Sequence, residues 1–391
     1  MTKIDFIYFD AGGGHRAAGN ALKEVVDSEH RATRGEPWEI RLVNLQEVPD
    51  SLDVFRKVTG IRLEDIYNTM LAKGWTLGSG LGVQFMHGVI RLYHGATVRL
   101  LTQHWADTQP DLVVSLVPNF NRAMYESLRK ALPKVPYVTV LTDFADYLPH
   151  FWMESGQEQY FVCGTEKAVE QAHSLGHTDD RIFPTSGMIL RPRFYEPVKV
   201  DRAEERARLG LHPTRPTGLV LFGGQGSKVM LEISERLRDT QLILICGRNE
   251  KLTARLKAQR ADAPRFIEGF TQEVPYYMYL SDFFIGKPGP GSISEAVAMK
   301  LPVIVERPNA FTLPQERYNP TWVREHRAGM VVDNFRGIAG AVKELLGSLD
   351  SYRESVSRIE NRAVFEIPDI LATILERAGA APSGRGSVRG V

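Results

Sequence analysis

The sequence predicts an α/β protein with two doubly wound domains, and three observations lead to this fold class. Short apolar runs alternate with amphipathic stretches along most of the chain, which is typical of parallel strands covered by helices on both faces. The series of runs occurs twice, and a charged, proline-rich stretch separates the two series. The 391 residues are also enough for two or three domains. We therefore expect two separate parallel sheets.

The apolar runs that we expect to form strands fall into two sets, one in each half of the chain. In the first half they span residues 4–9, 40–45, 112–117, 137–142 and 160–163. In the second half they span residues 219–222, 242–246, 283–285, 302–305 and 330–332. Helical patterns lie between most of these runs, for example at residues 16–26, 231–237 and 292–299.

The division between the two domains is expected within residues 190–216, where prolines and charged residues are frequent. We predict a first domain over residues 1–195 and a second domain over residues 196–365. Residues 366–378 are predicted to form a C-terminal helix. Residues 379–391 are mostly small or basic and poor in large apolar side chains, so we expect a disordered tail there.

The composition excludes several classes of protein. Lys and Arg total 48 and Asp and Glu total 47, so the net charge of +1 argues against a nucleic-acid-binding protein. The two cysteines, Cys163 and Cys246, are too few for a disulfide framework or a zinc cluster, and a reducing, intracellular setting fits them best. No apolar run is long enough to predict a membrane-spanning helix.

One stretch, residues 66–106, contains no Asp or Glu. Its charged side chains are cationic, and it also carries histidines and aromatic residues. Such a stretch is suited to lie on an anionic membrane surface. A pair of amphipathic core helices, joined by the glycine-rich turn GSGLG, would have the same composition. The residues by themselves favour the core helices, because amphipathic core helices are so common.

The first candidate for chemistry is the sequence DAGGGH at residues 10–15, which follows the first expected strand and opens a helix. Its glycines allow a ligand to approach the backbone, and the helix N-terminus favours an anion. The same dipole disfavours a charged imidazole, so we expect a neutral His15, which suits a general base. A tight turn with a capping histidine is the structural alternative.

Two further glycine-rich segments follow expected strands in the second half. The sequence FGGQGS, at residues 222–227, repeats the position of the first motif, and its backbone amides are candidates for a phosphate contact. The sequence GKPGPGSISE, at residues 286–295, passes from a strand through a rigid turn into a helix. The first motif is not a dinucleotide fingerprint, and no Walker loop occurs anywhere in the sequence.

The turn of the third motif has the features of a nucleotide site. The amides of Gly291, Ser292 and Ile293 open the expected helix and would face a diphosphate. Glu295, one turn further, is placed to accept hydrogen bonds from two ribose hydroxyls, although it would also suit the first turn of any helix.

A fourth motif, LPQE, ends in Gln315 and Glu316 and follows the next expected strand. A neighbouring amide and carboxylate suit the recognition of a sugar, which is rich in hydroxyl groups. A solvated loop would have the same sequence, so this motif alone leaves both possibilities open.

Seven motifs occur in a characteristic order along the chain. They are GGGH near the start, LTDFADYLPHFW at 141–152, GGQG at 223–226, CGRN at 246–249, EGF at 268–270, KPGPGSISEA at 287–296 and PQE at 314–316. Together they resemble the monogalactosyldiacylglycerol synthase family and, more distantly, the lipid II-forming GlcNAc transferase. The resemblance extends over about residues 1–370, and the combination of motifs is more specific than any one of them.

The resemblance implies a GT-B fold, in which two Rossmann-like domains face each other across a cleft. The N-terminal domain would bind the acceptor and associate with the membrane, and the C-terminal domain would bind a UDP-sugar. The acid-free residues 66–106 coincide with the membrane-associating region of the family. With the resemblance, we favour an anionic membrane surface over the pair of core helices for this stretch.

The resemblance also implies a role for each matching residue. Phe270 would lie beside the uracil, Glu295 would bind the ribose, and Gln315 and Glu316 would contact the hexose. His15 would deprotonate the acceptor, and Asp143 is a candidate to orient His15 or the acceptor, although capping a strand end explains it equally well. The complete set of expected donor-binding residues is Gly224, Gln225, Arg248, Phe270, Gly291, Ser292, Ile293, Glu295, Gln315 and Glu316.

We therefore expect inverting transfer of a hexose from a UDP-sugar to a lipid hydroxyl, with diacylglycerol as the first candidate. We expect no cofactor and no essential metal, because the sequence has no DxD triplet to hold a diphosphate-bound ion. The expected partners are the UDP-hexose, the lipid and an anionic membrane surface, and no nucleic acid. The expected location is cytoplasmic and peripheral, on the inner face of the cell membrane.

Three other interpretations stay open at this point. A UDP-GlcNAc 2-epimerase-like enzyme has the same architecture and needs no acceptor. A soluble transferase could glycosylate a small natural product without any membrane surface. A non-catalytic sensor could bind a nucleotide-sugar and release no UDP.

Overall fold

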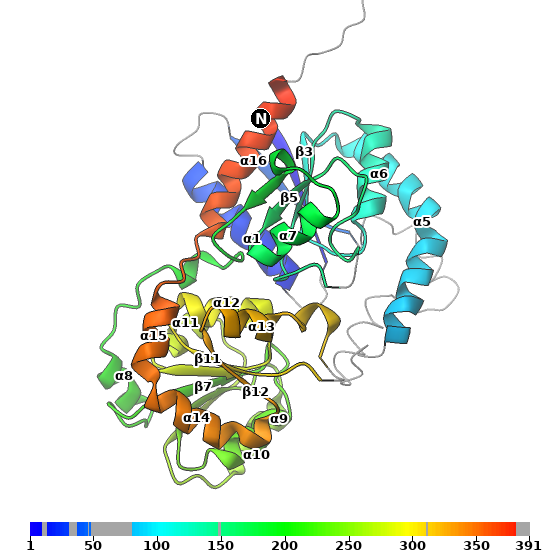
Figure 1. The fold of residues 1–391 in the computed structure, drawn as a ribbon. Helices are drawn as coiled ribbons and strands as arrows, with labels where there is room; N and C mark the ends of the chain where they lie inside the picture. The colour runs from blue at the N-terminus through cyan, green and yellow to red at the C-terminus, as the bar shows by residue number, and fades with distance from the viewer. Residues whose placement is uncertain are drawn as a thin grey trace, which may run out of the picture.

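The computed structural model describes residues 1–9, 14–30, 37–45, 47, 80–147, 150–309 and 312–380. They form two parallel sheets, each with six strands and with helices on both faces (Figure 1). The predicted α/β fold with two doubly wound sheets is therefore confirmed.

The first sheet has the strand order β2-β1-β3-β4-β5-β6, and every neighbouring pair is parallel. Its strands are β1 (Thr2–Tyr8), β2 (Trp38–Asn44), β3 (Leu112–Ser115), β4 (Tyr137–Val140), β5 (Tyr160–Cys163) and β6 (Ile182–Pro184). Apolar side chains of α1 (Gly14–Val25) and α16 (Ala363–Ala380) pack on one face. The other face is covered by α5 (Gly80–Thr108) and α6 (Asn121–Ala131), and α7 (Glu166–Ser174) packs beside β5.

The second half of the acid-free stretch belongs to a core helix. Val98, Leu101 and Trp105 of α5 are buried against the first sheet, and the Trp105 indole donates to the Ser127 hydroxyl over 2.9 Å. These three side chains are therefore not available to a membrane, as expected for a core helix, and the anionic membrane surface stays a prediction. Residues 66–79 lie outside the described residues, so a membrane contact by the first half of the stretch stays a prediction.

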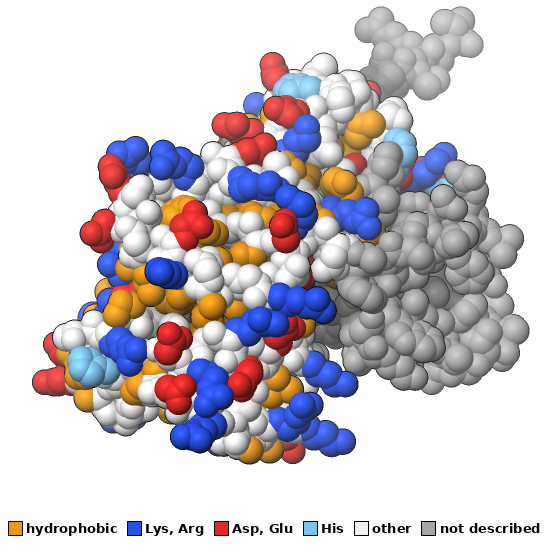
Figure 2. Space-filling model, turned by 60° about the horizontal axis from the view of Figure 1, so that its bottom comes forward, with side chains coloured by type: hydrophobic (Ala, Val, Ile, Leu, Met, Phe, Trp, Pro, Cys, Tyr) orange, Lys and Arg blue, Asp and Glu red, His pale blue; other side chains and the backbone are white. Residues whose placement is uncertain are grey.

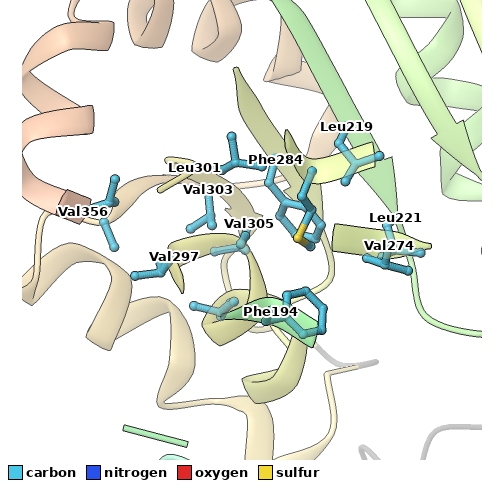
Figure 3. Close-up of a cluster of buried hydrophobic side chains, with 14 of the residues drawn as sticks. Phe194, Leu219, Leu221, Val274, Phe284, Val297, Leu301, Val303, Val305 and Val356 are labelled. Carbon is cyan, nitrogen blue, oxygen red and sulfur yellow. The ribbon is translucent and has the colours of Figure 1, made fainter. Parts of the chain in front are cut away.

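The second sheet has the order β12-β11-β10-β7-β8-β9, again all parallel. Its strands are β7 (Thr217–Leu221), β8 (Gln241–Ile245), β9 (Arg265–Glu268), β10 (Phe283–Gly286), β11 (Val303–Glu306) and β12 (Gly329–Val332). One face packs on α11 (Val274–Tyr279), α12 (Pro290–Ala298), α13 (Asn319–Glu325) and α15 (Leu349–Ser357), as Figure 3 shows in part. The other face packs on α9 (Val229–Arg236), α10 (Glu250–Ala258) and α14 (Ile338–Gly347).

All ten predicted runs overlap strands, and the structure adds β6 and β9, one at the edge of each sheet. Both added strands are short and only partly buried. An edge strand needs no continuous apolar run, because it has a neighbour on one side only, so the pattern that predicts buried strands misses it.

The connection between the two sheets is well packed. Phe194, in a short 3-10 turn at Pro192–Phe194, is buried in the apolar cluster of the second sheet, together with Met188 and Leu190. The connection is followed by the short helix α8 (Arg202–Arg208). The chain later returns from α15 to α16 on the first sheet (Figure 1). The division at residue 195 stays a prediction.

The C-terminal helix α16 includes the predicted helix at 366–378 and continues to Ala380. Residues 381–391 of the expected tail lie outside the described residues. None of the described helices has the length and apolar character needed to cross a membrane. On the face drawn in Figure 2, acidic and basic side chains lie interspersed over the described residues, in keeping with the net charge of +1.

A buried carboxylate joins α8 and α15 to the second sheet. Asp282 accepts from Nη2 of Arg206 at 2.7 Å, from Nη2 of Arg202 at 3.1 Å and from the amide of Thr217 at 2.8 Å, and it also pairs with Arg353. Burial alone would raise the pKa of Asp282, but the guanidiniums of Arg202 and Arg206 hold it below its usual value. Asp282 is therefore ionised and compensates three cations.

We predict that Asp282→Ala lowers the free energy of unfolding by about 3–5 kcal/mol, because it leaves the buried Arg206 guanidinium without its carboxylate. Urea unfolding measures the change. Asp350→Ala is the matched control: Asp350 lies 3.8 Å from Arg353 on the surface, so this variant should unfold like the wild type. Equal losses in the two variants would contradict the role given to Asp282.

Candidate active site

Each sheet reverses its strand order at one point, between β1 and β3 in the first sheet and between β7 and β10 in the second. In doubly wound sheets, ligands bind outside the carboxyl ends of the strands at this point. His15 follows β1, and the glycine segments 223–226 and 287–291 follow β7 and β10. The structure therefore places three of the predicted motifs at the two reversal points.

The carboxyl edges of the two sheets face each other. The Phe144 ring, in the loop after β4, lies against the Trp322 ring of α13, with 4.8 Å between the ring centroids. Both side chains belong to the apolar cluster that also includes Phe194 of the connection. The loops that follow the strands of both sheets are thereby brought together.

His15 is held by residues of the first domain. Its Nδ1 lies 3.2 Å from the Thr142 hydroxyl, and its ring lies 6.1 Å from the Trp152 ring, centroid to centroid. Burial lowers the pKa of His15 to about 4, and a hydrogen bond with the backbone of Leu116 opposes this shift. The imidazole is therefore neutral at pH 7. Burial, rather than the helix dipole invoked from the sequence, is the main cause.

Asp143 is almost fully buried and accepts a hydrogen bond from the Trp152 indole at 2.9 Å. Burial raises its pKa to about 7, against the effect of this hydrogen bond. Glu316, from the second domain, raises the pKa further and Lys287 lowers it. The described side-chain hydrogen bond of Asp143 is therefore with Trp152, whereas the hydroxyl of Thr142 contacts His15.

The segment after β7 is shaped by glycines. Gly223 and Gly226 have φ angles of +71° and +60°, a region that side chains with a Cβ rarely adopt. The Arg248 amide donates to the Gly224 carbonyl over 2.9 Å. A Cβ on Gly247 would lie only 2.3 Å from the Gly224 oxygen, so the segments after β7 and β8 can meet only because this residue is glycine.

Phe270, predicted to lie beside the nucleobase, contacts Arg248, another predicted donor-binding residue. The Arg248 guanidinium lies over the Phe270 ring, 4.5 Å from its centroid. Phe270 is 52% exposed, which is unusual for a large apolar side chain in this protein. Gln225, close by, is exposed, and its carbonyl accepts from the Asn249 side chain at 3.3 Å. The exposed ring is therefore available to stack on a flat partner.

The turn into α12 presents backbone amides at the carboxyl edge. Pro290 begins the helix, and the Asn319 side chain fixes the turn by donating to the Pro288 carbonyl over 2.7 Å. The amides of Gly291 and Ser292 have no acceptor within the helix, because they lie in its first turn.

Ile293 differs from the prediction. Its amide donates to the Gly289 carbonyl over 3.1 Å, and its side chain is fully buried in the core. The hydrogen-bonding pattern of the helix therefore already uses this amide. The expected diphosphate contact fits Gly291 and Ser292 and does not fit Ile293.

Glu295 lies on α12 and is half-buried. Burial raises the pKa of its carboxyl to about 7, and the charge of Arg191 opposes this shift. A carboxyl group that exchanges its proton near neutral pH can both accept and donate hydrogen bonds.

Gln315 and Glu316 lie in a 3-10 turn, Pro314–Glu316, after β11. Gln315 is half-buried, whereas Glu316 is only 7% exposed. A Glu316 oxygen accepts from Lys287 Nζ at 2.7 Å. Sequence reasoning missed Lys287, Thr142 and Trp152 as site residues. The sequence did indicate a role at the site for these three residues, because they lie inside the motifs KPGPG and LTDFADYLPHFW.

Within the described parts of the chain, no group of three or more His, Cys, Asp or Glu side chains is arranged to hold a metal ion. The expectation that transfer needs no metal stays a prediction. Both cysteines are buried and free.

We predict that Asp143→Asn removes a pH dependence of stability. In the wild type, folded Asp143 keeps its proton up to about pH 7, whereas the unfolded chain loses it near the ordinary value of 3.8. The free energy of unfolding of the wild type should therefore fall as the pH rises between these two pKa values. Between pH 5 and pH 8 it should fall by about 2 kcal/mol more than that of the Asn variant. Urea unfolding at both values checks this.

The control for this experiment is Asp350→Asn on the exposed surface, whose stability should follow that of the wild type at both pH values. A constant difference between Asp143→Asn and the wild type would show that the carboxyl titrates normally.

Comparisons with known proteins find similarity both in sequence and in fold. Residues 53–188 match a family model described as monogalactosyldiacylglycerol (MGDG) synthase. Monogalactosyldiacylglycerol synthase 1 of Arabidopsis thaliana is 25% identical over 97% of this chain and 72% of its own length. A probable monogalactosyldiacylglycerol synthase 2 of Oryza sativa subsp. japonica is 28% identical over 82% of this chain and 68% of its own.

Solved structures share the fold at low sequence identity. MurG of Acinetobacter baumannii superimposes with a TM-score of 0.59 at 10% identity, covering 95% of this chain and all of MurG. A UDP-GlcNAc 2-epimerase of Neisseria meningitidis gives 0.58 at 13% identity, covering 96% of this chain and all of the epimerase. These neighbours confirm the GT-B fold, and together with the similar synthases they support a glycosyltransferase. As its motifs predict, the chain resembles the monogalactosyldiacylglycerol synthases over most of its length.

Proposed function

We propose that this protein is an inverting glycosyltransferase that moves a hexose from a UDP-sugar to the hydroxyl of diacylglycerol, giving a monoglycosyl diacylglycerol. The observation that carries the proposal is the placement of a neutral, half-buried His15 at the reversal point of the first sheet, across from the donor-type loops of the second domain. The similarity to synthases named for a galactolipid supports the lipid acceptor and the hexose donor.

The second domain offers a group for each part of a UDP-sugar. The exposed Phe270 ring and the Arg248 guanidinium suit the uracil. The carboxyl of Glu295 suits the ribose hydroxyls. The free amides of Gly291 and Ser292 suit the diphosphate, because helix N-termini and glycine turns bind anions. The exposed segment with Gly224 and Gln225 lies beside this turn at the reversal point.

Gln315 and Glu316 provide the amide and carboxylate for the hexose hydroxyls. The neutral imidazole of His15 removes the proton of the acceptor hydroxyl as its oxygen attacks the anomeric carbon. The bond from that carbon to the UDP oxygen breaks on the opposite side, so the configuration inverts. Fixed amides then stabilise the charge that develops on the leaving diphosphate, at about 3 kcal/mol for each donor.

The same proposal includes a place of action. A lipid acceptor is reached from a membrane surface, and the cations of residues 66–106 would favour an anionic one. We place the enzyme in the cytoplasm, bound peripherally to the inner face of the cell membrane, and we expect it to need neither a metal nor a cofactor.

The test is a panel of UDP-galactose, UDP-glucose and UDP-GlcNAc with diacylglycerol in anionic vesicles, scored by the mass of the product. We expect one UDP-hexose to give a monoglycosyl diacylglycerol. In this assay His15→Ala should lower turnover by about 10²–10⁴-fold, while UDP affinity stays near the wild-type value. His173→Ala, on the surface of α7, is the matched control and should leave turnover unchanged.

Other results would point elsewhere. UDP-ManNAc formed from UDP-GlcNAc alone would identify an epimerase, and transfer only to soluble acceptors without vesicle binding would exclude the lipid. Full turnover by His15→Ala would exclude His15 as the base.

We predict that Glu295→Ala weakens UDP binding roughly ten- to a hundredfold, because a half-buried carboxyl that accepts two ribose hydroxyls is lost. Isothermal titration calorimetry measures the affinity. Glu250→Ala, on α10, controls for the loss of an acidic side chain and should bind UDP normally. An unchanged affinity of the Glu295 variant would remove Glu295 from the ribose site.

A further inference from the structure

Lys287 lies among three segments that the proposed function gives to the donor. It follows β10 directly, at the reversal point of the second sheet. A Cβ built on Gly289 would lie 3.1 Å from Cε of Lys287 and 3.5 Å from its Nζ, and one built on Gly223 would lie 3.9 Å from Cε. The end of the lysine side chain therefore lies between the glycine segments after β7 and β10.

The third segment is the turn that carries Glu316. The Oε1 atom of Glu316 lies 2.7 Å from Lys287 Nζ and 3.5 Å from a Cβ built on Gly289. Glu316 is almost fully buried, whereas 43% of the Lys287 side chain is exposed. The lysine is thus the accessible member of the pair, and an incoming ligand can reach its ammonium group.

The negatively charged groups near Lys287 favour a cation at this position. The negative charge of Glu316 raises the pKa of Asp143, so the two carboxyl groups lie close to each other. A nucleoside diphosphate adds further negative charge. Lys287 lowers the pKa of Asp143. Its ammonium group is therefore placed to balance the negative charge of nearby carboxylates and of an incoming diphosphate.

We propose that Lys287 binds the donor diphosphate and changes partner when the donor enters. Without donor, the ammonium donates to Glu316. With donor, it donates to a phosphate oxygen, and the Glu316 carboxylate is released to accept a hydrogen bond from a hexose hydroxyl. This proposal rests on the proposed function, because it requires a UDP-sugar between these segments, and it gives Lys287 a role that the motif comparison does not.

The partner exchange makes a specific thermodynamic prediction for UDP, which has a diphosphate but no hexose. Lys287→Met should weaken UDP binding about ten- to a hundredfold, because a charge-assisted hydrogen bond is lost. Glu316→Gln should strengthen UDP binding several-fold, because the ammonium no longer has to leave a carboxylate. In the double variant, Glu316→Gln should have no further effect on UDP affinity.

Calorimetric titration of UDP into the full chain at several salt concentrations measures these effects. The affinity of the wild type should fall more steeply with salt than that of Lys287→Met, because one phosphate contact by a cation is missing in the variant. Lys287→Arg keeps the charge and should stay within a few-fold of the wild type. Lys257→Met, on α10, is the matched control and should bind UDP like the wild type.

Each other outcome has one meaning. If the wild type binds no UDP, the proposed function fails and this inference fails with it. If the wild type binds UDP and a folded Lys287→Met binds it equally well, only the role of Lys287 is overturned. If Glu316→Gln weakens UDP binding as much as Lys287→Met does, the ion pair only maintains the shape of the site and the exchange of partners is wrong.

Discussion

The candidate site depends on one constraint, namely that the carboxyl edges of two parallel sheets face each other. The contact between the Phe144 and Trp322 rings and the apolar packing of the connection around Phe194 hold the sheets in this arrangement. Because both sheets reverse their strand order near the contact, loops from distant parts of the chain end at one place. Without this packing, His15 and the donor-type loops would belong to two unrelated surfaces.

Burial gives this place its chemical character. It lowers the pKa of His15 to about 4 and raises those of Asp143 and Glu295 to about 7. A group of titratable residues with shifted pKa values at the edge of a sheet is typical of a functional site. The ion pair of Lys287 with Glu316 adds the one feature that a negatively charged ligand requires, a cation that can be reached from outside.

The fold alone does not decide the reaction. The structures that superimpose on this chain include both MurG and a UDP-GlcNAc 2-epimerase, with nearly equal TM-scores. The distinction must come from the side chains at the site and from the acceptor surface. One face of the end of α5 packs on the first sheet through Val98, Leu101 and Trp105, and its other face is exposed.

The sequence by itself determined the fold class and the identity of most candidate residues. Buried parallel strands require continuous apolar runs, so ten of the twelve strands were predictable, and the glycine-rich motifs after them marked the loops. Tertiary structure decided the rest, because the remaining features depend on contacts between distant residues. Thr142, rather than Asp143, contacts His15; Ile293 gives its amide to Gly289; and Lys287 meets Glu316 across two loops. Packing in the folded protein sets the direction of each side chain and the partners of amides and charged groups. The order of residue types along the chain does not reveal these partners.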